Sequence, residues 1–451
     1  MIIELDLATP WEPPAPPPRR VRRWSAAVLV AVVALGVLVA AAPRRPDGPA
    51  FTIEHNVLNV AGAGGRIFVG RFHSVGSAPR LHAMRLSDGA ELWSTQITPQ
   101  QRLALATAQV VVLSTDWTED ASWSTIAVLD AATGGRLWHR DTVQVLGRAG
   151  GTMVVEDMAG ADPDAEPPPG PDDDPAVNRA PVRRQRHYLG LDERTGATVW
   201  TLEVPAGSAA EAGWDQHTTY KLLHLAQLDP DGLLRLRDPA TGAITGSHRL
   251  AWSGTIASFT VSKGRPGQVI VFPAGQRGAA IFDLDTGERL WGWSGKMYGG
   301  LLQCGPDRYC GGADTGLDNV DVRTGRIVWH IDRYAGILHI GARTMVLGSY
   351  IQPDAESASY VVVDAATGRL QRKIEGWRLI GARGEHLIVS HPGDRGGALL
   401  GVLDPGSGVV ALFGKAPQWY GMPECTADEE HLACVAVGAL SVWRLPPTRR
   451  P

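Results

Sequence analysis

Residues 128–138 read Val-Leu-Asp-Ala-Ala-Thr-Gly-Gly-Arg-Leu-Trp, and residues 320–329 repeat the pattern as Val-Asp-Val-Arg-Thr-Gly-Arg-Ile-Val-Trp. Each stretch is an apolar run, a turn of the form Asp-x-x-Thr-Gly, and a second apolar run that contains Trp. Six weaker or equal copies end at Trp93, Trp200, Gly246, Trp291, Arg372 and Leu412. The turn glycine recurs every 38–46 residues, apart from one spacing of 62. Such a period predicts a repeat architecture.

The shared turn predicts a tight β-hairpin. Its glycine takes a positive φ without steric cost, and its aspartate accepts hydrogen bonds from backbone N–H groups ahead of it. The threonine hydroxyl can form similar bonds. Arg85 replaces the aspartate in the first copy. The turn aspartates predicted from the other copies are Asp130, Asp192, Asp238, Asp283, Asp321, Asp364 and Asp404.

Two further strand-like runs precede each hairpin. In the fifth copy the four runs are Thr255–Val261, Gln268–Phe272, Ala279–Leu284 and Arg289–Trp293. Four short antiparallel strands in about 43 residues are typical of one β-propeller blade. Because a single blade cannot bury both of its faces, the blades must stack around a ring. The fold class predicted is therefore all-β, a β-propeller of four-stranded antiparallel blades.

The blade number is harder to predict than the fold. After the eighth motif, Gly421–Asp428, His431–Val437 and Ala439–Leu445 add three strands without a fourth. Phe51–His55 could supply the missing outer strand, and a literal count then gives nine blades. We predict eight, with seven and nine as alternatives. The fourth copy is the weakest, since it lacks the Trp and Asp215–Tyr220 is a poor first strand.

Five tryptophans occupy one position on the last strand of their repeats. We predict that they pack between neighbouring blades, with the indole N–H bonded to the adjacent turn. A role in stacking on a ligand is the alternative, and recurrence in register favours packing. The residues are Trp93, Trp138, Trp200, Trp291 and Trp329.

Four cysteines form two close pairs, Cys304 with Cys310 and Cys425 with Cys434. Both pairs flank the turn between the first two strands of their repeat. The even count, the shared placement and an exported location favour two local disulfides, 304–310 and 425–434. A metal site is the alternative, but neither pair has the two-residue spacing typical of one.

The amino-terminal region predicts a membrane anchor. Residues 25–42 are 18 consecutive uncharged residues, flanked by four arginines before and two after. The positive-inside rule places the amino terminus in the cytoplasm and exports the rest. A cleaved signal peptide is the alternative. The predicted division is 1–24 cytoplasmic Pro-rich tail, 25–42 transmembrane helix, 43–50 linker, 51–445 propeller and 446–451 C-terminal tail.

Residues 161–182 explain the long spacing as an insertion within the third repeat, rich in Asp and Pro at its start. Asp172, Asp173 and Asp174 suggest calcium binding, but the prolines favour a solvated loop over a compact cage. The Pro-rich stretch of the tail could likewise bind a partner as a polyproline II helix, and a stiff spacer is the favoured alternative. A formal net charge of −4 argues against nucleic acid as a partner.

The Asp-x-x-Thr-Gly-x-x-x-Trp repeats over residues 51–445 resemble those of the quinoprotein-like propellers. That superfamily includes dehydrogenases that use pyrroloquinoline quinone (PQQ) and the barrel-assembly scaffold BamB. The resemblance implies the fold but not one function. The dehydrogenases carry adjacent cysteines over the quinone and a bound calcium, and this chain has no Cys-Cys dipeptide. We therefore predict no cofactor, no metal and no catalytic residue.

The prediction for function is a non-catalytic binding or scaffold module. Tethered by one helix at the cell membrane, the extracytoplasmic propeller would bind an envelope protein or a cell-wall ligand. One alternative is an extracytoplasmic sensor that signals through the short cytoplasmic tail. A PQQ-dependent dehydrogenase is a weaker alternative.

Overall fold

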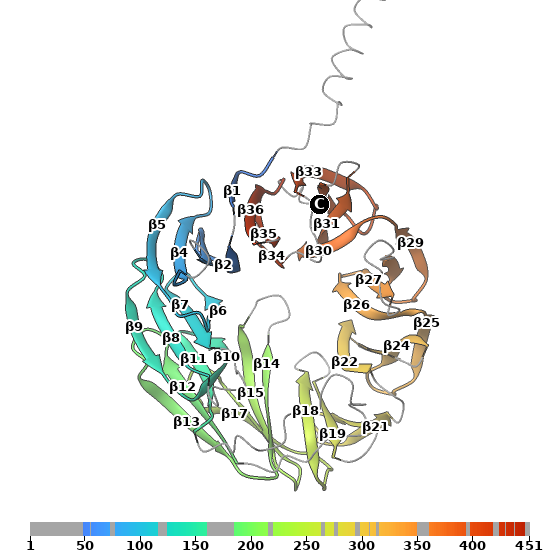
Figure 1. Ribbon diagram of the computed structural model, residues 1–451. Coiled ribbons are helices and arrows are strands. Elements are labelled where there is room, and N and C mark those ends of the chain that lie inside the picture. The colour runs from blue at the N-terminus through green and yellow to red at the C-terminus, as the bar shows by residue number, and fades with distance from the viewer. Residues whose placement is uncertain are drawn as a thin grey trace, which may run out of the picture. The chain divides into compact units, whose positions relative to one another are not determined.

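Every strand in the described part of the chain belongs to one of nine four-stranded antiparallel sheets (Figure 1). The computed structural model describes residues 48–54, 56–72, 77–115, 124–159, 185–214, 220–262, 267–274, 278–293, 298–305, 307–312, 315–349, 360–393, 397–417, 424–428, 430–436 and 438–446. Within these ranges no helix has the length and apolar character needed to cross a membrane. The predicted span at 25–42 and the insertion at 161–182 lie outside them.

The first three blades follow one another along the chain. Blade 1 contains β2 (Val57–Ala63), β3 (Arg66–Arg71), β4 (Arg80–Arg85) and β5 (Glu91–Gln96). Blade 2 contains β6 (Gln101–Ala106), β7 (Val110–Thr115), β8 (Ile126–Asp130) and β9 (Arg136–Arg140). Blade 3 contains β10 (Val143–Ala149), β11 (Thr152–Asp157), β12 (Arg186–Asp192) and β13 (Thr198–Val204).

The next three blades keep the same strand order. Blade 4 contains β14 (Ala209–Trp214), β15 (Leu222–Leu228), β16 (Leu233–Arg237) and β17 (Ile244–Arg249). Blade 5 contains β18 (Ile256–Ser262), β19 (Gln268–Pro273), β20 (Ala279–Asp283) and β21 (Arg289–Trp293). Blade 6 contains β22 (Tyr298–Gly305), β23 (Arg308–Gly312), β24 (Gly316–Asp321) and β25 (Ile327–Asp332).

The last three blades complete the ring. Blade 7 contains β26 (Tyr334–Ile340), β27 (Thr344–Ser349), β28 (Tyr360–Asp364) and β29 (Leu370–Ile374). Blade 8 contains β30 (Arg378–Arg383), β31 (His386–Pro392), β32 (Ala398–Leu403) and β33 (Val410–Ala416). Blade 9 contains β34 (Glu424–Ala427), β35 (His431–Ala436), β36 (Ala439–Arg444) and, as its outer strand, β1 (Phe51–Ile53).

The prediction of eight blades was wrong, because the fourth repeat forms a complete blade. Its first strand is β14, which lies before the segment 215–220 that looked unsuitable. Small residues such as Gly213 let the strands approach closely, and the His224 ring occupies the space where a side chain at 213 would lie. Leucines of β15 are buried against both neighbours and those of β16 against blade 5, so this blade packs without the Trp.

Strand β1 closes the ring by pairing antiparallel with β36, from Phe51↔Val442 to Ile53↔Leu440. Residues of blades 9 and 1, including Val442 and Ile67, then share one hydrophobic cluster. The amino-terminal strand therefore supplies the missing outer strand of the last blade.

The core is divided among the interfaces between blades. The described residues form nine hydrophobic clusters, and each cluster joins one blade to the next. The ring is stabilised where the faces of adjacent sheets interdigitate, as expected for a radial repeat.

Candidate binding surface

The strand order gives the ring two different faces. Strands alternate in direction, so connections between first and second strands and between third and fourth strands emerge on one face. We call this the turn face. The connections between second and third strands, and from each blade to the next, emerge on the other, which we call the loop face. The repeated Asp-x-x-Thr-Gly turn joins the third and fourth strands and lies on the turn face.

The turn aspartates organise the backbone of the turn face. In blade 3, Asp192 Oδ1 accepts hydrogen bonds from Thr195 N (2.8 Å), Thr195 Oγ1 (2.9 Å) and Arg194 N (3.1 Å). The bonds from the Thr195 backbone and hydroxyl lower the pKa of the Asp192 carboxyl below its usual value. Corresponding bonds to backbone N–H groups are made by Asp130, Asp238, Asp283, Asp321, Asp364 and Asp404.

In five repeats the residue after the turn aspartate connects two blades. Ala131 N donates to Gln109 O in the other turn of blade 2 (2.9 Å), and Ala131 O accepts from Trp93 Nε1 of blade 1 (3.0 Å). The four other predicted tryptophans make the same bond to the following blade: Trp138 to Glu193 O (3.1 Å), Trp200 to Pro239 O (3.2 Å), Trp291 to Val322 O (2.8 Å) and Trp329 to Ala365 O (3.3 Å).

The turn glycines lie against these tryptophans. A Cβ atom built on Gly325 would be 2.5 Å from the Trp291 ring, and the same holds for Gly368 and Trp329. Both glycines have φ near +70°. Glycine is therefore required twice, for the backbone conformation and for the close approach of the indole.

Other groups take the place of the tryptophan where it is missing. Phe51 of β1 packs on Gly89 of blade 1, with ring atoms 2.8 Å from a Cβ built there. Arg372 of blade 7 donates to Ser407 O (2.6 Å) and Gly406 O (2.8 Å) in the turn of blade 8. At these junctions the turn face is connected from blade to blade by contacts of a side chain with the backbone.

Both predicted disulfides are present, Cys304–Cys310 between β22 and β23 and Cys425–Cys434 between β34 and β35. The buried Asn319 of β24 donates its amide to both sulfurs of the first pair, at 3.3 and 3.4 Å. Each disulfide links the two inner strands of its blade.

The loop face differs from blade to blade. The longest stretches of sequence between strands, 116–125, 158–185 and 350–359, all join second and third strands, and the strand ends that flank them lie on this face. Connections on the turn face include many tight turns, such as 64–65, 107–109 and 150–151. Variable loops on a rigid scaffold are where binding functions are usually found.

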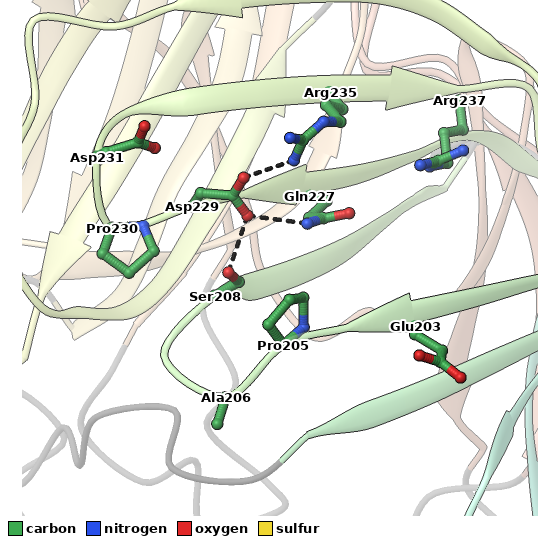
Figure 2. Close-up of a pocket in the computed structure, with 10 residues that line it drawn as sticks. All are labelled: Glu203, Pro205, Ala206, Ser208, Gln227, Asp229, Pro230, Asp231, Arg235 and Arg237. Atoms are coloured by element: carbon green, nitrogen blue, oxygen red, sulfur yellow. Dashed lines mark hydrogen bonds and ion pairs between the residues drawn. The ribbon is translucent and has the colours of Figure 1, made fainter.

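A pocket of about 610 Å³ opens between blades 3 and 4 (Figure 2). The lining residues come from the blade-to-blade connection 205–208, from the β15–β16 turn, and from strands β13, β15 and β16. They are Glu203, Pro205, Ala206, Ser208, Gln227, Asp229, Pro230, Asp231, Arg235 and Arg237. None is aromatic, and most carry a polar or charged group.

Asp229 is the centre of the pocket's hydrogen-bond network. Its Oδ1 accepts from Ser208 Oγ and from Gln227 Nε2, both at 2.8 Å, and its Oδ2 forms an ion pair with Arg235 (Figure 2). Asp231 pairs instead with Arg249, and the hydrogen bond from Arg249 lowers the pKa of the Asp231 carboxyl. Arg237 donates from Nη1 to Gly242 O at 3.0 Å.

Sequence reasoning missed a histidine and aspartate cluster in blade 6. His330 Nδ1 lies 2.7 Å from Asp318 Oδ1, and its Nε2 lies 3.1 Å from Asp332 Oδ1 and 3.3 Å from Thr315 Oγ1. The hydrogen bond with Asp318 chiefly raises the pKa of the imidazole. Asp332 is next but one to His330 along the chain, and the β24–β25 register, which pairs Asp318 with His330, brings Asp318 to the same ring.

No residue was predicted to be catalytic or to bind a cofactor or metal. Among the residues that the structure describes, no three or more His, Cys, Asp and Glu side chains are grouped as a metal site would require. Asp172, Asp173 and Asp174, considered as calcium ligands, lie outside the described residues.

A family model described as outer membrane protein assembly factor BamB matches residues 24–163 and 164–330, more than half of the chain. No curated protein matches the chain in sequence. BamB from Moraxella catarrhalis is 15% identical over 88% of this chain and 99% of its own, with a TM-score of 0.38. Quinohemoprotein alcohol dehydrogenase from Comamonas testosteroni is 11% identical over 89% and 77%, with a TM-score of 0.41. At these identities and TM-scores, the solved structures carry no inference about function.

Proposed function

The chain belongs to the family described as outer membrane protein assembly factor BamB, and on that premise we propose that it is a non-catalytic scaffold that binds protein partners at the cell envelope. The loop face is the proposed binding surface. The anchor at 25–42 would hold the propeller outside the cell membrane, with residues 1–24 in the cytoplasm.

The contrast between the two faces is the observation that supports this proposal most. On the turn face, the turn aspartates and the tryptophans form hydrogen bonds with other groups of the ring. The strand ends that the longest connections join lie on the loop face, and so do residues 205–208 and 229–231 of the pocket between blades 3 and 4. A rigid ring with one internally bonded face and one variable face suits recognition of a partner.

Crosslinking on intact cells tests the function. The tagged full-length protein is crosslinked, purified under denaturing conditions and examined by mass spectrometry. We expect one or a few exported or membrane proteins, joined through residues of the propeller. The control is residues 1–50 fused to an unrelated exported domain, which reports proteins captured only by proximity to the membrane. Identical capture by the control and the full chain would contradict the proposal.

A further inference from the structure

Blade 4 breaks a rule that the other repeats obey. The residue directly before the turn aspartate is buried and apolar in blades 2, 3, 5, 6, 7 and 8, as Leu129, Leu191, Phe282, Val320, Val363 and Leu403. In blade 4 this residue is Arg237, and Arg235 lies two positions earlier on the same strand. Side chains two apart share one face of a strand, so β16 directs two guanidinium groups to the same side.

That side faces blade 3. In the eight other interfaces the hydrophobic cluster includes an apolar residue from the third strand of the following blade, or one directly after that strand. The cluster between blades 3 and 4 has residues of β14 and β15, such as Ala212 and Leu225, but none of β16. Both arginines line the pocket of Figure 2, Arg235 in the middle of β16 and Arg237 at its turn-face end, where Nη1 donates to Gly242 O of the turn.

The two arginines are not equivalent. Arg235 is neutralised by Asp229. Among the described residues no carboxylate pairs with Arg237, and its enclosed Nε atom has no hydrogen-bond partner. Burial lowers the pKa of its guanidinium, and the charge of Arg235 lowers it further. A partly desolvated cation without a counter-charge is unfavourable, and an incoming anion would relieve that cost.

We propose that the pocket between blades 3 and 4 binds the carboxylate of an acidic side chain from a partner protein, with Arg237 as the residue that recognises it. This deepens the scaffold function proposed above and rests on it for the source of the carboxylate. Guanidinium and carboxylate groups match in geometry, and arginine is enriched among residues that dominate binding energy.

The other charges narrow the chemistry of the ligand. Of the three carboxylates in the lining, Asp229 pairs with Arg235 and Asp231 pairs with Arg249, which leaves Glu203 and Arg237 as one charge of each sign. Without an excess of positive charge, the pocket suits a singly charged carboxylate better than a dianion such as phosphate. The same carboxylates can accept hydrogen bonds from peptide N–H groups. With no aromatic ring in the lining, the pocket lacks the surface on which a sugar ring would stack.

Calorimetric titration of the purified full-length protein in detergent tests the proposal. The probe is acetyl-Gly-Glu-Gly-Glu-Gly-amide, and its matched control carries Gln in place of Glu. We expect the Glu peptide to bind at least about tenfold more tightly than the Gln peptide. Arg237→Leu should remove that difference and Arg237→Lys should keep part of it. The exposed turn residue Arg369 supplies the control variant, Arg369→Leu, which should bind as wild type does.

Arg237→Leu places in blade 4 the residue that blades 2 and 3 already have, so the variant should fold, and thermal unfolding verifies this. Equal affinity of wild type and Arg237→Leu for the Glu peptide would overturn the proposal, as would no preference for Glu over Gln or no measurable binding. Glutarate tests whether a small free carboxylate is sufficient. If glutarate binds as tightly as the Glu peptide, the proposal that the carboxylate belongs to a partner protein is rejected. Failure of the scaffold function is distinguished by the crosslinking experiment on intact cells, in which the wild-type protein would then capture no specific partner.

Discussion

Single side chains connect the blades on the turn face. A tryptophan on the outer strand of one blade donates its indole N–H to the backbone beyond the next turn aspartate, and its ring lies on the next turn glycine. Both contacts occur at the rim, where adjacent sheets diverge. We infer that they fix the spacing of neighbouring blades as well as adding buried area.

Trp329→Ala should lower the free energy of unfolding by about 3–5 kcal/mol, because the side chain is only 8% exposed and its removal leaves a cavity against Gly368. The matched control is Val328→Ala, since its neighbour Val328 is 41% exposed on the same strand. Chemical denaturation of the two variants checks the difference. Similar losses in both would show that the indole does not hold blades 6 and 7 together.

The His330 cluster predicts a pH dependence. The pKa of the His330 imidazole is raised above its usual 6.5, mainly by the hydrogen bond with Asp318 and also by Asp332. The folded state therefore holds the proton more tightly than the unfolded state does. The stabilisation is complete below the unfolded pKa and is lost as the pH rises through the folded pKa.

The melting temperature should accordingly be lower in His330→Gln than in wild type at pH 5.5, and the gap should narrow at pH 9. A series of thermal melts across this range gives the comparison. Asp318→Asn serves as the second variant and should show the same trend, since it removes the main partner. A gap that widens with pH would rule out this account of the cluster.

At the scale of the element, the hairpin turn combines two demands on one glycine. Asp-x-x-Thr-Gly could be interpreted from the sequence alone, because side-chain acceptors and positive φ are local properties. The contact of each glycine with the tryptophan of the preceding blade is not local. It depends on how two sheets pack, which no single repeat encodes.

Comparing Gly325→Ala with Gly65→Ala distinguishes the cost of the positive φ from the cost of the close tryptophan contact. Gly325 has φ +68° and Gly65 has φ +71°, but a Cβ would meet the Trp291 ring only at Gly325. Both variants should lose about 1–2 kcal/mol through left-handed backbone strain, and Gly325→Ala should lose a further 1–3 kcal/mol, roughly, from overpacking. Equilibrium unfolding measures both. Equal losses would mean that the indole moves aside without cost.

At the scale of the whole molecule, the period of the sequence repeat predicts the fold class correctly but does not predict the number of blades. The eight motifs and the three trailing strands were visible, and Phe51–Ile53 closes the ring as a literal count implied. The error came from treating the missing Trp of blade 4 as a missing blade. Leucines of β15 and β16 pack against blade 5 without it, and this depends on tertiary contacts.

The candidate pocket was less accessible to prediction than the fold. Arg235 and Arg237 stand in a strand pattern that looks ordinary in isolation. Aligning the repeats on the turn aspartate shows that Arg237 replaces an apolar residue, but only the structure shows that both arginines face blade 3. The unpaired state of Arg237 also depends on where Asp229 and Asp231 find their partners.

Ring closure by β1 gives a prediction at the same scale. Phe51→Ala should lower the melting temperature, because it removes the contact of blade 9 with Gly89 of blade 1 and weakens the pairing of β1 with β36. Differential scanning calorimetry detects the shift, with Thr52→Ala, an exposed position on the same strand, as the control. An unchanged melting temperature in Phe51→Ala would argue that the ring does not depend on this strand.

Site-specific photocrosslinking in living cells tests the central claim most directly. A photoreactive residue is placed at Asp141 or Glu375 on the loop face, and at Ala132 or Arg323 on the turn face, all four being exposed. We predict that the loop-face positions form adducts with the envelope partner and that the turn-face positions do not. Adducts confined to the turn-face positions would contradict the account.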